Sequence, residues 1–410
     1  MEQQRASTFD PSLHQAVPLW RDIRVLTIAV QIIFAVVVVA VGVALVNNML
    51  AALASAGITP NADFLQRTAG FGIGEGPAFT RESTFADAFR VGLVNTLRVV
   101  SVGLVLATAL GVVVGIARLS SNWLVKNIAL VYIEIMQNTP LLVQLYFIYL
   151  GVFLALPNLR DGPLELPGPV YLSNRGLVLP ALIFSETFST WFLYVLLGVL
   201  AAAFVWYART QQAERAGVPP TNRLLPALLA LAAFAFIGWL VVGPPPLTVS
   251  LPVPDMRELP TGELTVRRID GGETLTPEYA ALLTGLVIYT GAFIAEVVRA
   301  GIQAVPYGQV EAARSQGFSY MQTLRLIVLP QALRIIIPPL GNHYLNLTKN
   351  SSLAIIIGFP DLFAVSNTIA NQSGQSVTML LLVMVSYLTM SLLLSGGTNF
   401  INRRMQIKER

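Results

Sequence analysis

Long apolar segments alternate with shorter polar ones along most of the chain. A run of about 20 apolar residues is long enough to cross the hydrocarbon core of a bilayer as an α-helix. The pattern therefore predicts an all-α polytopic membrane protein with about eight transmembrane helices, and it leaves the number of spans between 177 and 243 open. The predicted spans lie at about 25–46, 93–117, 127–151, 179–207, 224–242, 279–298, 335–358 and 377–400.

The first apolar run allows two interpretations. Three arginines precede it, and Ala54-Ser55-Ala56 follows it, as in a cleavable signal peptide. The run at 25–46 is, however, longer than the core of a usual signal peptide. We therefore expect it to be a retained membrane anchor.

The polar segments between the spans divide the chain into parts. Segment 47–90 carries Gly70, Gly72, Gly74 and Gly76, whose spacing differs from that of a dinucleotide-binding fingerprint. It is therefore expected to be an outer loop. The expected order is a polar segment at 1–24, an anchor at 25–46, an outer segment at 47–90, a first core part at 91–152, an insertion with two further helices at 153–278, a second core part at 279–400 that contains a loop at 303–333, and a basic tail at 401–410.

Composition agrees with a membrane protein. The chain is 54% hydrophobic and 12% charged, with a mean hydropathy of +0.66, which lies outside the range of soluble globular domains. Cysteine is absent, so disulfides and thiolate metal sites are excluded, and the two histidines, His14 and His343, are too far apart in sequence to suggest a metal centre. We expect no metal site.

The distribution of basic residues predicts the orientation. If both termini are cytoplasmic, well over half of the 26 Lys and Arg residues fall in the loops and tails on that side, although the opposite segments are longer. This bias follows the positive-inside rule. The net charge of +4 therefore does not require a nucleic-acid partner.

A polar and basic island at 306–339 lies between the long apolar segments of the sixth and seventh predicted spans. Pro306 precedes a predicted short helix, in which Glu311 is expected near the positive helix end. Gly317 is placed to end that helix, and Ser319 with Gln322 has the form of a capping box that opens a second one. Leu329-Pro330 is expected to close the second helix.

Small side chains at Ala312, Ala313 and Ser315 would let another surface approach the first of these helices. The other interpretation is an ordinary polar loop between membrane helices. The island also resembles the EAA motif of permease subunits in binding-protein-dependent ABC importers. The matching residues are Glu311, Ala312, Ala313, Gly317, Ile327, Val328, Leu329 and Pro330. In that family the loop is a cytoplasmic coupling helix that docks on a separate ATPase subunit.

Three further segments resemble the polar amino-acid branch of this family: 139–145 (TPLLVQL), 295–302 (AEVVRAGI) and 349–353 (KNSSL). The resemblance covers roughly half of the chain. It implies a type I permease core of five helices, with three extra helices here, as in the longer permeases of general or glutamate, glutamine, aspartate and asparagine importers. Where family members commonly have a basic residue or glycine before TPLL, this chain has Gln137-Asn138, so a charge-based substrate role there is in doubt.

The resemblance also implies partners. These are ABC ATPase subunits, a second permease that forms a heterodimer or a homodimer with this chain, a periplasmic amino-acid-binding protein and membrane lipid, in the bacterial inner membrane. The lysines Lys126, Lys349 and Lys408 have no preceding glycine, so the chain lacks a Gly-Lys-Ser/Thr phosphate loop. We therefore expect no catalytic residues and no cofactor in this chain, with ATP and Mg²⁺ bound by the ATPase partner.

Polar residues within the spans are candidates for a substrate path. A charge at membrane depth is costly unless it faces a cavity or a partner, and Lys349 is the clearest instance. Either Lys349 meets a substrate carboxylate, or it forms an ion pair with Glu134 or Glu296 that holds the bundle together. The candidates are Glu134, Thr139, Gln144, Glu296, Lys349, Asn350, Ser351 and Ser352.

The resulting prediction is a permease subunit that translocates polar L-amino acids and draws on ATP hydrolysis by a partner. The first alternative is an ion- or proton-coupled secondary transporter, with Glu134, Glu296 and Lys349 as relays. It predicts inverted repeats, which the sequence does not display, and leaves the EAA loop unexplained. The second alternative is a membrane-embedded enzyme, for which no nucleophile motif or acid–base cluster is present.

Overall fold

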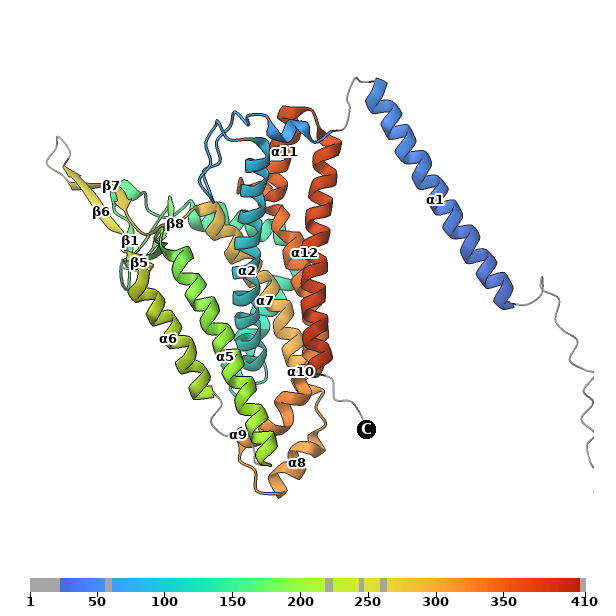
Figure 1. Cartoon of the computed structure of the whole chain (residues 1–410), viewed down its shortest axis with the longest axis vertical. Helices are drawn as coiled ribbons and strands as arrows, with labels where there is room; N and C mark the ends of the chain where they lie inside the picture. Colours follow the sequence, from blue (N-terminus) through green and yellow to red (C-terminus); the bar gives the residue numbers. More distant parts are fainter. Residues whose placement is uncertain (1–22, 56–60, 218–223, 243–246, 259–263, 406–410) are drawn as a thin grey trace, which may run out of the picture.

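A computed structural model describes residues 23–55, 61–217, 224–242, 247–258 and 264–405. The core of the described chain is a bundle of helices (Figure 1). The bundle is built from α2 (Phe85–Ala117), α3 (Trp123–Asn138), α7 (Pro277–Gln303), α10 (Leu329–Asn350), α11 (Leu362–Ser373) and α12 (Ser376–Met405). The helix α1 (Ile23–Ser55) stands apart from the bundle, and no residue of its apolar span is buried.

Helices α2 and α7 pack closely at the centre of the bundle because small residues face the contact. A Cβ atom built at Gly111 would lie 2.5 Å from Ile294 Cγ2, and one at Gly115 would lie 2.7 Å from the Ala295 carbonyl oxygen. In a bilayer, where lipid is as apolar as the side chains, such close backbone approach is a main source of helix association. Local signals fix where both helices begin: Thr84 and Asp87 form a capping box on α2, and Thr276 caps α7.

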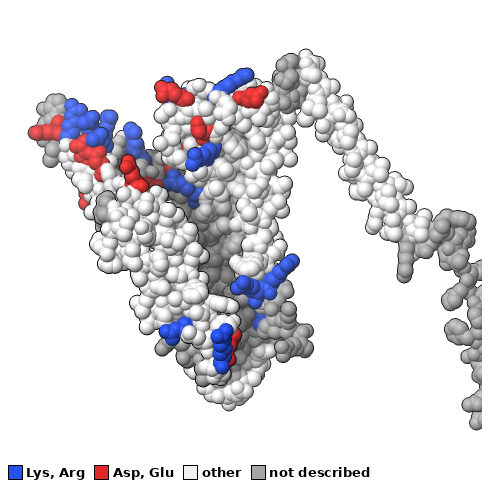
Figure 2. All heavy atoms as spheres, in the orientation of Figure 1, with Lys and Arg blue, Asp and Glu red and all other residues white. Residues whose placement is uncertain are grey.

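The bundle has two distinct ends. The short helices α8 (Tyr307–Ser315) and α9 (Tyr320–Thr323) project from one end, which we call the loop end. The strands and α11 lie at the other, which we call the sheet end. Charged side chains gather at these two ends, and the surface over α5, α6 and α12 between them is almost free of charge (Figure 2). This band has the character of a lipid-facing belt.

The span predicted as one helix at 127–151 is broken. Helix α3 ends at Asn138, α4 (Leu141–Tyr146) follows, and a π-helical turn (Phe147–Phe153) completes the segment. The two parts are bent by 107°. The prediction of a continuous helix was wrong because Pro140 has no N–H for the carbonyl of Met136 and cannot continue the ladder.

The inserted part contains a helical hairpin, α5 (Phe188–Ala216) and α6 (Leu224–Val242), that packs on itself. The predicted helix at 179–207 was wrong at its start, because residues on both sides of Pro180 form strands instead. The strands are β1 (Leu164–Leu166), β2 (Val170–Ser173), β3 (Gly176–Leu179), β4 (Ala181–Phe184), β5 (Leu247–Ser250), β6 (Val253–Glu258), β7 (Leu264–Asp270) and β8 (Glu273–Leu275).

The strands form three small antiparallel sheets at the sheet end. One has the order β1-β2-β3-β8, and β4 pairs with β5 and β6 with β7. The pairing of Leu177 with Leu275 joins the insertion to the start of α7. The sheets therefore attach the hairpin α5–α6 to the bundle.

Helix α10 is longer than the predicted span at 335–358. It begins at Leu329, directly after a π-helical turn (Leu324–Val328), and runs through Pro330, Pro338 and Pro339. The prediction that Leu329-Pro330 closes a helix was wrong, because Pro330 occupies the first turn of α10, where its missing N–H costs little. A 3₁₀ segment (Ser351–Ile357) continues the span.

Seven helices in the described part of the chain are long and apolar enough to cross a membrane, and the bent pair α3–α4 makes an eighth span. This confirms the predicted number of spans. The largest buried cluster lies between α2, α7 and α10 and includes Val99, Leu145, Leu282, Leu286 and Leu347.

Candidate functional site

The loop between α7 and α10 is built by strong local signals. Helix α8 ends where Gly317 adopts a left-handed conformation (φ 82°), and the Phe318 N–H then donates to the Ala313 carbonyl at 3.1 Å. Ser319 and Gln322 form a reciprocal capping box on α9. Both predictions are confirmed. The predicted position of Glu311 near the helix start is wrong, because it is the fifth residue of α8 and lies beyond the first turn.

The tip of this loop exposes large apolar side chains. Tyr307 and Tyr320 are 65% and 71% exposed, and Met321 and Leu326 are also exposed. Such a group at one end of a protein marks an interaction site. Among the small residues, Ala312 faces outward, whereas Ala313 is buried against the bundle. Ser315 is exposed as well, so Ala312 and Ser315 let a partner approach, and Ala313 lets α8 lie close to its own bundle.

Two glutamines missed by the sequence analysis connect the loop to α10. Gln331 Nε2 donates to Gln309 Oε1 at 2.8 Å and to the Ile327 carbonyl at 2.9 Å. Ile327 and Pro330 are half-buried beside them, and Leu329 is exposed. This contact links α8 directly to the first turn of α10.

The break in the third span explains Gln144 and Thr139. The Gln144 side chain is buried, and its Nε2 donates to the Met136 and Thr139 carbonyls, both at 2.9 Å. Pro140 leaves the Met136 carbonyl without its usual donor, and Gln144 replaces that donor. The geometry assigns Gln144 to holding the bend, which differs from the predicted contact with substrate.

Lys349 has no ion pair among the described residues. The predicted partners are engaged elsewhere: Glu296 pairs with Arg299, and Glu134 accepts from Asn138 at 3.0 Å. Lys349 itself is exposed at the side of α10. The interpretation of Lys349 as half of a bundle-locking ion pair is therefore wrong for this chain.

Lys349 belongs to a polar stripe on α10. Asn342, Asn346 and Lys349 are exposed, and His343 and Asn350 are half-buried on the same side. Leu347 in this stretch packs near Gly103, which lies about halfway along α2. The stripe is therefore at the middle of the membrane span, where polar groups are retained only if they face a cavity or a partner.

A cavity of about 270 Å³ lies between this stripe and α7. Tyr289, Thr290 and Phe293 of α7 line it opposite His343, Asn346 and Asn350. His343 and Asn346 were missed by the sequence analysis, although they precede Asn350 by seven and four residues, which places all three on one helix face. Ser351 and Ser352 do not line this cavity. The hydroxyl of each donates instead to the backbone carbonyl three residues earlier.

A helical bundle with a broken span, a polar stripe at mid-depth and an exposed apolar tip is the architecture expected of a membrane permease that works with a partner. Residues 223–407 match the family of binding-protein-dependent transport system inner membrane components. The general L-amino acid transport system permease protein AapQ of Rhizobium johnstonii is 40% identical over 89% of this chain and 88% of its own length.

A second relative is the glutamate/glutamine/aspartate/asparagine transport system permease protein BztB of Rhodobacter capsulatus, 38% identical over 95% of this chain and 96% of its own. A solved amino acid ABC transporter with histidines has 22% identity and a TM-score of 0.45 over 78% of this chain and 95% of its own. The chain belongs to the family of ABC-importer permease subunits. It is a multi-pass inner-membrane transport component, and ATP hydrolysis resides in a separate subunit.

Proposed function

We propose that the chain translocates polar L-amino acids into the cell along the polar stripe of α10. The exposure of Lys349, Asn346 and Asn342 at mid-span is the observation that carries this proposal. Every amino acid has an α-carboxylate, and Lys349, an exposed cation about one turn after the cavity-lining Asn346, is a suitable partner for that group. The substrates of the relatives AapQ and BztB support the same class of solute.

The stripe requires a partner on its open side, because lipid cannot solvate it. A second permease subunit meets this requirement and would enclose a path between the two chains. We assign a heterodimer, in keeping with separate glutamine permeases named GlnM and GlnP among the relatives in Bacillus subtilis. The loop end and both termini then lie in the cytoplasm, and a periplasmic amino-acid-binding protein docks at the sheet end.

ATPase subunits, which bind ATP and Mg²⁺, dock on the tip around Ala312, Gly317 and Tyr320. Their closure displaces α8, and the contact of Gln309 with Gln331 passes this displacement to α10. Because α10 carries the stripe, the same motion changes access to the solute path. Rigid helices that rock about a fixed site are a common form of alternating access.

Replacement of Lys349 by methionine tests the solute path. Lys349→Met removes the charge without leaving a partner unpaired, so we expect the chain to assemble normally. Uptake of labelled L-glutamate or L-glutamine should fall by about tenfold or more, the usual effect of losing one charged hydrogen bond to a ligand. The measurement is initial uptake in proteoliposomes that contain the complete complex.

The matched control is Lys126→Met, because Lys126 is also exposed but lies at the start of α3, away from the stripe. Uptake by this variant should equal that of the parent protein. Normal uptake by an assembled Lys349→Met complex would contradict the proposed path.

A further inference from the structure

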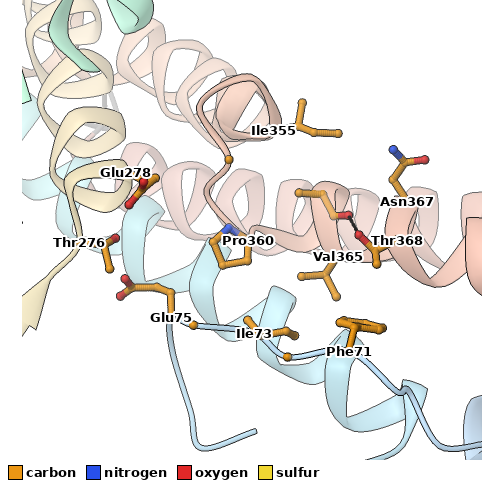
Figure 3. A pocket seen from close by; sticks show the side chains of 14 residues that line it. Phe71, Ile73, Glu75, Thr276, Glu278, Ile355, Pro360, Val365, Asn367 and Thr368 are labelled. Atoms are coloured by element: carbon orange, nitrogen blue, oxygen red, sulfur yellow. Dashed lines mark hydrogen bonds between the residues drawn. The ribbon is translucent and has the colours of Figure 1, made fainter. Parts of the chain in front are cut away.

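The glycine-rich segment at 70–76, which we call the strap, covers a second cavity at the sheet end. This cavity has a volume of about 570 Å³, within the range of small-molecule sites. Phe71, Ile73 and Glu75 of the strap form one wall (Figure 3). The opposite walls come from Thr276 and Glu278 at the start of α7, Ile355 and Pro360 after α10, and Val365 and Thr368 of α11.

One buried side chain fastens the strap to the far wall. Asn95 Nδ2 donates to the Glu75 carbonyl at 3.1 Å and to the Pro360 carbonyl at 2.9 Å. This position depends on the glycine beside it, because a Cβ atom at Gly76 would lie 2.1 Å from Asn95 Oδ1. Any side chain at position 76 would therefore displace Asn95 from both carbonyls.

An ionic contact supplements this fastening. Glu75 Oε1 lies 3.6 Å from Arg98 Nη1, and Arg98 also pairs with Glu273 and lies over the Tyr279 ring. Burial raises the pKa of Glu75, and Thr276 and Arg98 act in the opposite direction. When desolvation offsets much of the attraction, a buried ion pair adds little net stability. The ionic contact therefore adds little to the hydrogen bonds of Asn95 in holding the closed position.

The backbone of the strap favours movement. Gly70 and Gly76, at its two ends, adopt positive φ angles of 72° and 96°. At Gly72 and Gly74 a Cβ atom would meet nothing within 4 Å, so neither space nor conformation requires glycine there. Four glycines in seven residues leave the chain unusually free to change conformation. Just before the strap, the Ala69 N–H donates to the Ser83 carbonyl at 2.8 Å and anchors that end.

We propose that the strap is a lid over an outer solute chamber and opens when Asn95 and Arg98 release Glu75. The inference rests on the proposed function, which places the sheet end outside. The chamber lies near the stripe along the chain, because Ile355 in its wall follows Asn350 by five residues. Arg98 also contacts Glu273 in β8, so force on the sheet from a docked binding protein reaches the lid through that arginine.

The absence of cysteine from the chain allows a direct test. Ile73→Cys places a single thiol on the inner side of the strap, and a membrane-impermeant maleimide added from outside reports its exposure in the complete complex. We expect slow labelling at rest. Adding Gly76→Ala, which displaces Asn95, should speed labelling by about tenfold, as expected when one or two hydrogen bonds that close a segment are lost.

Binding protein with ATP should produce a similar increase in the parent Ile73→Cys complex. Glu82→Cys, at an exposed site outside the strap, is the control and should label at one rate throughout. If Gly76→Ala fails to assemble, Arg98→Gln releases the ionic contact and should also speed labelling.

The lid proposal would be overturned if Ile73→Cys were labelled at the same rate in three conditions: at rest, with the releasing substitution, and with binding protein and ATP. Amino-acid uptake by the Ile73→Cys complex separates the two proposals. Uptake with constant labelling refutes the lid alone, whereas labelling that responds to Gly76→Ala without any uptake refutes the proposed transport function.

Discussion

Gly317→Asp is expected to lower ATP-driven amino-acid uptake by about tenfold or more, while the protein still inserts and assembles its own bundle. Gly317 is exposed at the tip of the loop and has a φ of 82°. A side chain there meets nothing within 4 Å in the chain itself, so any loss beyond the backbone strain of the positive φ must come from the partner's surface. A carboxylate placed in a closely packed interface is costly when it has no partner. The measurement is uptake together with the amount of ATPase subunit that co-purifies.

Gly374→Asp is the matched control for this prediction. Gly374 also has a positive φ of 72° and open space around it, but it follows α11 at the sheet end. The backbone strain of the two variants is therefore similar, and only the location differs. Unchanged uptake in Gly317→Asp, or an equal loss of co-purifying ATPase subunit in both variants, would contradict the assignment of the loop as the docking site.

Gln144→Leu is expected to destabilise the permease by roughly 2–5 kcal/mol. The substitution leaves the Met136 and Thr139 carbonyls without donors. Each buried group left unpaired costs about 1–3 kcal/mol, and water cannot replace the donor within the membrane. The loss should appear as a lower midpoint of thermal unfolding of the purified complex and a smaller assembled fraction.

Gln137→Leu provides the comparison. Gln137 lies in the same span and makes one longer contact, from Nε2 to the Ala292 carbonyl at 3.4 Å. That carbonyl lies inside the helix α7, so we expect a loss of less than about 1 kcal/mol. Equal stability of Gln144→Leu and Gln137→Leu would show that Gln144 does not hold the bend.

Hydrophobic periodicity and segment length predicted the helices correctly where neighbouring residues alone determine the secondary structure. The predicted span at 224–242 coincides with α6, and the capping signals at Ser319 and Gly317 gave the ends of α8 and α9. The bend at Pro140 was not predicted because the hydropathy stays high on both sides of it. The strands on either side of Pro180 escaped for a similar reason, since a short apolar run has the same composition in a strand and in a buried helix.

The candidate sites divide in the same way. The EAA loop is local in sequence, and its helix caps were predictable. The inward position of Ala313, the place of Glu311 beyond the first turn of α8 and the continuation of the helix through Pro330 were not. Lys349 could be identified from the sequence because burying a charged side chain in a membrane costs free energy. That Lys349 forms no ion pair with Glu296 or Glu134 depends on where these residues lie in space. The contact of Asn95 with Pro360 joins residues 265 positions apart. No pattern within a window of sequence contains such a contact.

Reconstitution tests the central claim, that this chain is a solute path without its own source of energy. The purified chain alone in liposomes should not concentrate labelled L-glutamate or L-glutamine, with or without ATP. Together with its ATPase subunits, second permease and binding protein, it should do so only when ATP is hydrolysed. Concentrative uptake by the chain alone would contradict the account.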